Sequence, residues 1–211
     1  VAGFERMNNQ IIFYTNPMSR GQIVRWMLEE VACDYVDEIV EYGDAMKSPE
    51  YLAINPMGKV PALKHGDQII TECGAICAYL VDTFPESNLA PEISDRADYY
   101  RWMFFAAGPL ESAVTNRSLG FVPDDEQQRM AGYGSYALTL GVLDEFFSNR
   151  AYVCGEKFTA GDVYLGSQID FGLQFGSIDA TDNFNAYAER LRARPAYKES
   201  KRKDMALMPK S

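Results

Sequence analysis

The residues from Asn55 to Leu80 form the part of the chain whose types and spacing have the clearest chemical meaning. They comprise a loop ending in Val60-Pro61, a short strand, a tight turn at Gly66, a second strand, and Glu72 at the start of an apolar helix. If the Val60–Pro61 bond is cis, the N–H and C=O of Val60 face outward and can pair with a peptide as an extra strand. The first N–H groups of the helix can bind a carboxylate, and the Glu72 carboxylate can bind an amine. The pattern therefore predicts a binding site for a small peptide.

Two hydroxyl groups near the N-terminal strand are further candidates for chemistry. Ser19 follows the Asn16-Pro17 turn signal, where the first helix begins, so it either donates a hydrogen bond to a ligand or only caps that helix. Tyr14 lies within the strand itself, which favours a place in the core or in a pocket wall. The single histidine, His65, lies in a turn, and this excludes Ser-His-Asp and Cys-His mechanisms.

Composition narrows the classes of function. The chain has 211 residues, 47% of them hydrophobic, and a formal net charge of −10, which disfavours a nucleic-acid-binding surface. The one basic cluster, Lys198, Lys201, Arg202 and Lys203, is interpreted as a solvated helix end. No apolar run approaches the roughly 18 residues of a membrane span, so we expect a cytoplasmic protein without membrane contact.

The cysteines do not indicate a metal site. Cys33, Cys73, Cys77 and Cys154 lack Cys-x-x-Cys spacing, and one histidine does not complete a zinc site. We therefore expect reduced thiols and no metal.

Residues 8–84 are expected to form a first domain. The sequence predicts strands at 10–14 and 34–40, helices from Ser19 and at 48–52, a hairpin around Gly66, and a helix after Thr71. This β-α-β-α-β-β-α order implies a mixed four-stranded sheet with helices on both faces.

A second domain is expected over residues 92–211. The turn-rich segment 84–91 precedes it, and the later residues have helical periodicity. The expected helices are 95–107, 125–149, 163–175 with a capping box at Thr159 to Asp162, and 183–194, which stops at Pro195. The fold class is thus α/β followed by all-α.

Three motifs in this order resemble those of the cytosolic glutathione S-transferases. They are Asn55-Pro56-x-Gly58-Lys59-Val60-Pro61-Ala62-Leu63, Ile70-Thr71-Glu72-Cys73-Gly74-Ala75-Ile76 and Phe158-Thr159-x-x-Asp162. The first strand, turn and helix are most similar to bacterial members of the serine or cysteine type. The resemblance implies a thioredoxin-like N-terminal domain, glutathione as co-substrate with no cofactor, and transfer of its thiolate to apolar electrophiles in detoxification.

The resemblance also assigns roles to residues. Ser19 and Arg20 are implied to activate the thiol, with Tyr14 as the rival hydroxyl. Glutathione binding is implied for six residues, Lys47, Lys59, Val60, Pro61, Glu72 and Cys73, and a second-substrate pocket for five, Pro17, Met18, Phe104, Phe105 and Pro109. Cys73 departs from the family pattern, where a serine or threonine hydroxyl helps to hold the γ-glutamyl carboxylate. Its loss is expected to weaken binding by about 1 kcal/mol.

Two other functions remain open. A glutathione-dependent thiol reductase or peroxidase would need a cysteine at or beside position 19, where this chain has Ser19-Arg20. A non-catalytic transferase-like interaction module would have a damaged glutathione site. For the transferase itself we expect a homodimer, because the residues from Tyr99 to Phe105 are apolar and aromatic and the resemblance implies that this helix forms the dimer contact.

Overall fold

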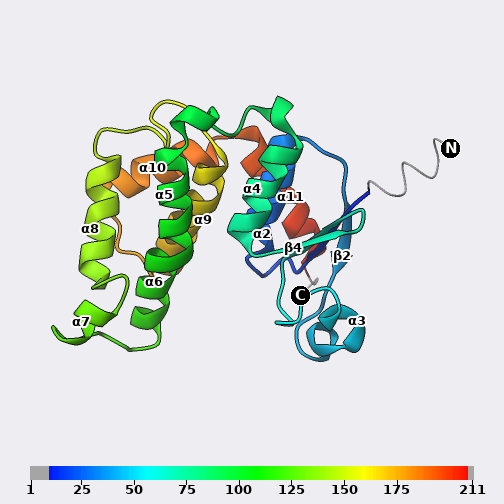
Figure 1. The fold of residues 1–211 in the computed structure, drawn as a ribbon, viewed down its shortest axis with the longest axis horizontal. Helices are drawn as coiled ribbons and strands as arrows, with labels where there is room; N and C mark the ends of the chain where they lie inside the picture. The colour runs from blue at the N-terminus through cyan, green and yellow to red at the C-terminus, as the bar shows by residue number, and fades with distance from the viewer. Residues whose placement is uncertain (1–9, 209–211) are drawn as a thin grey trace. The chain divides into compact units, whose positions relative to one another are not determined.

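The computed structural model describes residues 10–208, which form two compact units (Figure 1). One unit ends at Ser87 and also takes in the chain from Pro195 onward, and the other spans Asn88–Arg194. The change of unit after Ser87 falls inside the linker expected at 84–91. The start of the expected first domain at residue 8 and the end of the second at 211 lie outside the described residues.

The first unit contains the expected mixed sheet, in the order β2-β1-β3-β4. Strand β1 (Ile11–Thr15) pairs in parallel with β2 (Val36–Ile39) and antiparallel with β3 (Ala62–His65). A turn through Gly66, at φ +59°, joins β3 to the antiparallel strand β4 (Gln68–Thr71). This hairpin confirms the turn expected around Gly66.

Successive side chains of β1 point to opposite faces of the sheet, and both faces are packed. Phe13 is fully buried and packs against Arg25 of helix α2 (Gly21–Val31). The guanidinium carbon of Arg25 lies 5.2 Å from the centroid of the Phe13 ring. Tyr14 points to the opposite face, because successive side chains in a strand alternate. There it meets Tyr51 of helix α3 (Pro49–Leu52), with ring centroids 5.9 Å apart. Helices therefore cover both faces, as the element order predicted.

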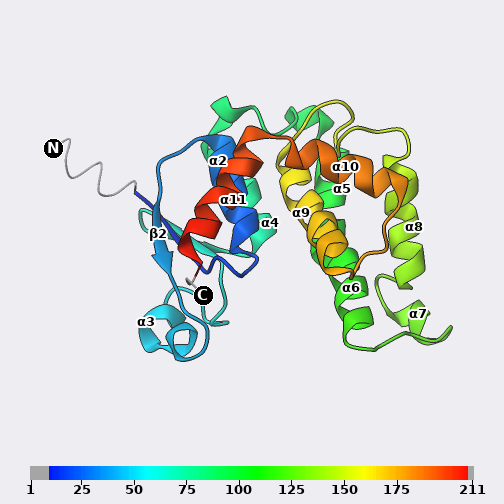
Figure 2. The same cartoon turned by 180° about the vertical axis from the view of Figure 1, so that it is seen from behind.

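The second unit is helical. It contains α5 (Ala97–Phe105), α6 (Glu111–Ser118), α7 (Gln127–Met130), α8 (Tyr136–Phe147), α9 (Ala160–Phe175) and α10 (Asp182–Arg192) (Figure 2). The continuous helix expected at 125–149 is wrong. Gly134, at φ +65°, interrupts it, and the Ser135 side chain accepts a hydrogen bond from the Leu138 N–H to begin α8. The helix expected at 95–107 instead continues through a wide turn, Ala106–Leu110, into α6.

Helix α9 is the buried centre of this unit, and Asp162 fixes its start. The Asp162 carboxylate accepts hydrogen bonds from the N–H of Val153 (2.7 Å), the N–H of Thr159 (2.8 Å), the Thr159 hydroxyl (3.1 Å) and the Tyr187 hydroxyl (2.9 Å). Burial raises the pKa of Asp162 to about 6, and the four donors oppose this shift. The capping box expected from Thr159 to Asp162 is present.

The last helix, α11 (Pro195–Leu207), was not expected, because Pro195 was interpreted as a stop signal. Proline is equally suited to the first turn of a helix, and here it begins one. Helix α11 packs along α2 in the first unit, so the all-helical domain does not run to the end of the described chain. Figures 1 and 2 both show the two helices side by side.

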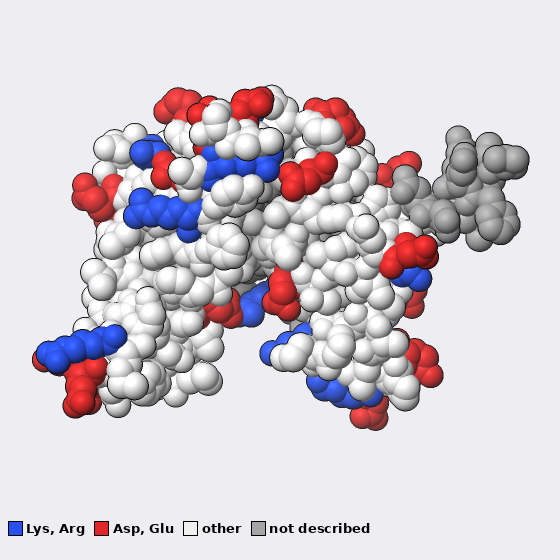
Figure 3. All heavy atoms as spheres, viewed as in Figure 1, with Lys and Arg blue, Asp and Glu red and all other residues white. Residues whose placement is uncertain are grey.

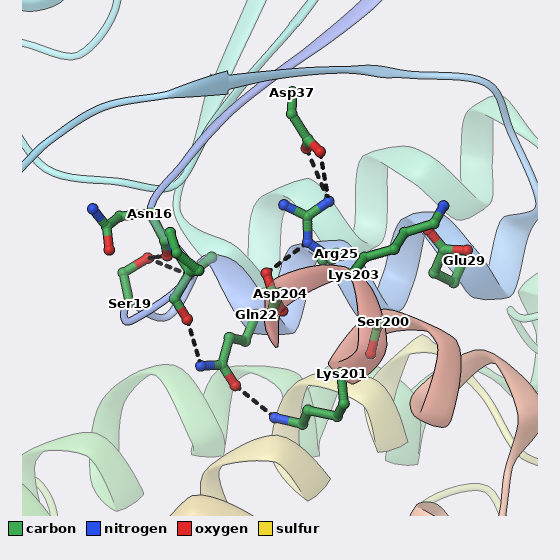
Figure 4. A network of polar contacts seen from close by, with 12 residues as sticks. Asn16, Ser19, Gln22, Arg25, Glu29, Asp37, Ser200, Lys201, Lys203 and Asp204 are labelled. Carbon is green, nitrogen blue, oxygen red and sulfur yellow. Dashed lines mark hydrogen bonds and ion pairs between the residues drawn. The ribbon is translucent and has the colours of Figure 1, made fainter. Parts of the chain in front are cut away.

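A buried ion pair holds α11 against α2 (Figure 4). The Arg25 side chain is fully buried, donates to Asp204 at 2.6 Å, and also donates to both oxygens of Asp37 at 2.9 and 3.0 Å. Trp26 packs edge-on against Tyr197 with ring centroids 5.1 Å apart. Because an unpaired charge in the core is costly, these contacts fix the position of α11.

Charged side chains of both signs are interspersed on the face of the molecule in Figure 3, without a continuous basic surface among the described residues drawn there. No helix in the described part of the chain is long and apolar enough to cross a membrane.

Candidate functional site

The turn between β1 and α2 places Ser19. Asn16 is almost fully buried, and its side-chain amide donates to the Val40 carbonyl at 3.2 Å. Its side-chain oxygen accepts from the Met18 N–H at 3.0 Å, and its main-chain carbonyl accepts from the Ser19 N–H at 3.0 Å. Asn16 therefore shapes the turn from inside.

The Ser19 hydroxyl has two protein partners (Figure 4). It donates to the Asn16 carbonyl at 2.7 Å and accepts from the Gly21 N–H at 2.9 Å. A side chain at position 21 would not fit, since a Cβ there would lie 2.0 Å from the Thr15 hydroxyl oxygen. A serine has only one proton to donate, so a ligand sulfur must compete with the Asn16 carbonyl for it.

The loop that leads into β3 is held by side chains from the α3 region. Tyr51 and Asn55 each donate to the Lys59 carbonyl at 2.7 Å. The ammonium group of Lys47 donates to the carbonyls of Met57 at 3.0 Å and Gly58 at 3.1 Å. Lys47 was expected to bind glutathione, and these two bonds show that it also braces the loop. An ammonium has three N–H groups, so one more donor remains.

Val60 lies at the end of this loop, and the Val60–Pro61 peptide bond is cis. Its side chain packs with Tyr14 against a small cluster formed by Val40, Met46 and Tyr51. Within residues 10–208, neither the N–H nor the C=O of Val60 forms a main-chain hydrogen bond. These two groups are therefore available to an extended ligand, in the manner of an added strand.

Glu72 precedes helix α4 (Cys73–Thr83) in an uncommon backbone conformation. Its φ of +67° and ψ of 120° lie in a region that residues other than glycine avoid, at a cost of about 1 to 3 kcal/mol. The side chain is exposed and makes no capping bond to the helix. Strain of this kind concentrates at functional sites, which is consistent with a ligand-binding role for this turn.

Cys73 connects the start of α4 to the Ser19 turn. Its sulfur contacts the Arg20 carbonyl at 3.7 Å, so two segments about 50 residues apart in sequence meet at this point. Cys77, one helical turn further along, is fully buried, and burial raises the pKa of its thiol well above the ordinary value. None of the four cysteines forms a disulfide. No group of three or more metal-binding side chains occurs among residues 10–208.

Tyr14 packs against an apolar cluster on its face of the sheet. It is partly buried against Val40, Met46 and Tyr51, and burial, with a smaller contribution from Glu38, raises the pKa of its phenol. These contacts place the Tyr14 ring at the edge of the core, and a role in a pocket wall stays a prediction. Arg20 and Lys59 are both exposed, and Pro61 is buried.

The expected second-substrate residues belong to different units. Pro17 is buried and Met18 is exposed in the Ser19 turn. Phe104 is 73% exposed on α5, whereas Phe105 packs edge-on against Trp102, 5.0 Å between centroids. Pro109 lies in the wide turn after α5. Phe105 thus has a core contact, and the pocket stays a prediction.

Comparison with known proteins shows which family this fold resembles. Residues 9–82 match the family model described as the glutathione S-transferase N-terminal domain. The chain is 27% identical over 170 residues to glutathione S-transferase GstA of Escherichia coli O157:H7, covering 78% of this chain and 81% of that protein. A solved structure of a sphingomonad glutathione S-transferase complexed with glutathione is 26% identical, with a TM-score of 0.73, covering 92% of this chain and 98% of that one.

A relative of another kind is elongation factor 1-gamma 1 of Oryza sativa subsp. japonica, which is 28% identical over 137 residues. That match covers 63% of this chain and 32% of the elongation factor. The architecture is that of a thioredoxin-like sheet domain combined with a helical unit. Residues 9–82 belong to the glutathione S-transferase N-terminal domain family, and the chain as a whole is similar to glutathione S-transferases.

Proposed function

We propose that this protein is a glutathione transferase that joins the thiolate of glutathione to an apolar electrophile. The observation that carries the proposal is the contact of Cys73 with the Arg20 carbonyl. It brings the start of α4, a site suited to a carboxylate, to the turn that holds Ser19. Glutathione combines the amine, carboxylate and thiol that these two segments can bind.

Each part of glutathione has a proposed partner. The main chain of Val60 pairs with the peptide as an added strand, beside Pro61. The first N–H groups of α4, including that of Cys73, bind the γ-glutamyl carboxylate, and Glu72 binds the γ-glutamyl amine. Lys47, with its remaining N–H, and the exposed Lys59 are the cations proposed for the glycine carboxylate.

The chemical step requires little beyond positioning and ionisation of the thiol. A free thiol has a pKa of about 8.5 and is only a few per cent ionised at neutral pH. A hydrogen bond donated by the Ser19 hydroxyl and the partial positive charge at the start of α2 favour the thiolate form. The positive charge of Arg20, the next residue, acts in the same direction. The sulfur then attacks an electrophilic carbon, a C–S bond forms, and the leaving group departs with its electron pair.

Calorimetric titration with glutathione, followed by turnover of a chlorodinitrobenzene electrophile, tests the proposal. We expect saturable binding and release of the chloride ion. Saturable binding without any turnover would reject the catalytic part of the proposal. Absence of glutathione binding would reject the whole proposal.

A second candidate is a non-catalytic binding module. The Ser19 proton is already donated to the Asn16 carbonyl, and elongation factor 1-gamma 1 is among the relatives. A module of this kind would show no turnover with any electrophile, even at saturating glutathione.

We also propose a homodimer that acts in the cytoplasm. Tyr100 and Phe104 on α5 are large hydrophobic side chains that are 48% and 73% exposed, which motivates the proposed association. Sedimentation at micromolar concentration should give about twice the 23.7 kDa chain mass. A single species of one chain mass would reject the dimer.

A further inference from the structure

The C-terminal helix α11 reaches the Ser19 turn through one side chain of α2. Lys201 on α11 donates from its ammonium group to the side-chain oxygen of Gln22 at 2.6 Å. The Gln22 amide nitrogen donates in turn to the Pro17 carbonyl at 2.7 Å. Figure 4 shows Gln22 between the turn and Lys201. Pro17 lies two residues before Ser19, so a residue near the C-terminus is joined to the candidate thiol-activating group by two hydrogen bonds.

The order of donors and acceptors makes this connection directional. An ammonium group can only donate, so the Gln22 oxygen must face Lys201. The Gln22 amide nitrogen must then face away from Lys201, where the Pro17 carbonyl, which can only accept, receives its hydrogen bond. Proline has no main-chain N–H, so this carbonyl is the only main-chain hydrogen-bonding group of Pro17. Lys201 therefore selects the orientation of the amide that holds the turn.

Other contacts between α11 and α2 lie further along both helices. Asp204 pairs with Arg25, and Lys203 donates to Glu29 at 2.6 Å. These contacts hold the helix but include no atom of the Asn16-Pro17-Met18-Ser19 turn. The contact of Lys201 with Gln22 is the one among these that continues into the turn.

We infer that Gln22 and Lys201 are positioning residues that hold the Ser19 turn in the geometry for thiol activation. This inference rests on the proposed function for its effect on the thiol. Its structural part, the restraint of the turn by α11, holds without any ligand. The basic cluster at the C-terminus is thus more than the solvated helix end that the sequence suggested.

Two variants interrupt the connection at different bonds. Gln22→Glu keeps the shape and the contact with Lys201 but sets an oxygen against the Pro17 carbonyl oxygen. Lys201→Met keeps the length of the side chain but leaves the Gln22 amide free to rotate. Lys203→Met is the matched control, because it removes the same charge from the same helix at a contact that does not reach the turn.

The first readout is hydrogen exchange of the ligand-free protein, measured for the peptide that contains the Ser19 amide. That amide donates to the Asn16 carbonyl and reports on the turn directly. Loss of one net hydrogen bond should speed its exchange about fivefold in Gln22→Glu and Lys201→Met. Lys203→Met should leave its rate unchanged. Equal rates in all three variants would overturn the inference, whether or not glutathione binds.

The second readout is the pKa of the bound glutathione thiol, followed by thiolate absorbance, together with turnover. We expect Gln22→Glu and Lys201→Met to raise this pKa and to lower kcat about three- to tenfold, with KM for glutathione little changed. Lys201→Met should have no further effect in a Ser19→Ala background. An undiminished effect there would show that Lys201 does not act through Ser19. If Ser19→Ala itself changes nothing, the proposed role of Ser19 fails, while the exchange result still decides the inference about the turn.

Discussion

Replacing Ser19 by alanine removes the one hydroxyl proton that the Asn16–Ser19 turn presents. In the ligand-free protein this proton is donated to the Asn16 carbonyl at 2.7 Å. A hydrogen bond to a thiolate is charge-assisted and contributes about 1.5 to 3 kcal/mol, whereas the bond to the carbonyl contributes about 1 kcal/mol. Moving the proton from carbonyl to sulfur therefore gains about 0.5 to 2 kcal/mol.

This difference sets the expected size of the effect. The Ser19→Ala variant should raise the pKa of bound glutathione by about 0.4 to 1.5 units and slow turnover about 2- to 30-fold. Affinity for glutathione should be nearly unchanged, since Val60, Glu72 and the start of α4 are proposed to hold the peptide. The variant also loses the bond from the Gly21 N–H to the Ser19 hydroxyl, and its unfolding free energy should fall by about 1 kcal/mol.

The assay is ultraviolet absorbance of the thiolate across pH, at saturating glutathione, with turnover measured in the same samples. Tyr14→Phe is the matched control, because it removes a hydroxyl from the neighbouring strand and keeps the ring contact with Tyr51. We expect Tyr14→Phe to change the thiol pKa far less than Ser19→Ala. The reverse result, loss of the thiolate signal in Tyr14→Phe alone, would refute the assignment.

Further predictions concern the peptide-binding turn and the buried ion pair. Glu72→Gln keeps the shape but removes the charge, and should weaken glutathione binding by about 1.5 to 3 kcal/mol in calorimetry; unchanged affinity would show that Glu72 does not bind the γ-glutamyl amine. Cys73→Ser restores a hydroxyl and should leave affinity equal or improve it by about 1 kcal/mol, so a weaker complex would contradict the proposed carboxylate site. Asp204→Ala leaves Arg25 buried with Asp37 as its remaining acid, and should lower the unfolding free energy by about 3 kcal/mol in denaturant titration; a loss below about 1 kcal/mol would show that the pair does not hold α11.

A pH prediction follows from the burial of Asp162. Because its pKa is raised to about 6 in the folded protein, its stabilising contribution is complete below the unfolded value of 3.8 and is lost as pH rises through 6. The unfolding free energy should therefore fall by up to about 3 kcal/mol between pH 4 and 7, relative to Asp162→Asn. Parallel pH profiles of the two proteins would contradict the shift.

The local patterns of the first unit were enough to predict its fold. The hairpin at Gly66, the helix after Glu72 and the Asn16-Pro17 turn depend on turn residues and short-range periodicity, which the sequence displays directly. The break at Gly134 was missed because the apolar residues on either side of it continue with helical spacing. Helix α11 was missed because the sequence alone does not tell whether Pro195 ends one helix or begins the next.

The site was only partly predictable for a different reason. Ser19, Val60, Glu72 and Cys73 stand in motifs, so the sequence indicated them as candidates. The partners of Gln22 could not be found in this way, since Lys201 lies 179 residues away and no local pattern joins them. The partners of Lys47 could not be predicted from the sequence either, because its bonds to the Met57 and Gly58 carbonyls depend on how the loop folds back.

Glutathione binding and ionisation of its thiol can be tested together in one measurement, the thiolate absorbance of the wild-type protein with saturating glutathione, followed across pH. We expect the bound thiol to titrate about one to two units below the value of about 8.5 for a free thiol. A titration at the value of free glutathione, with no difference between the mixture and its separate components, would contradict this expectation.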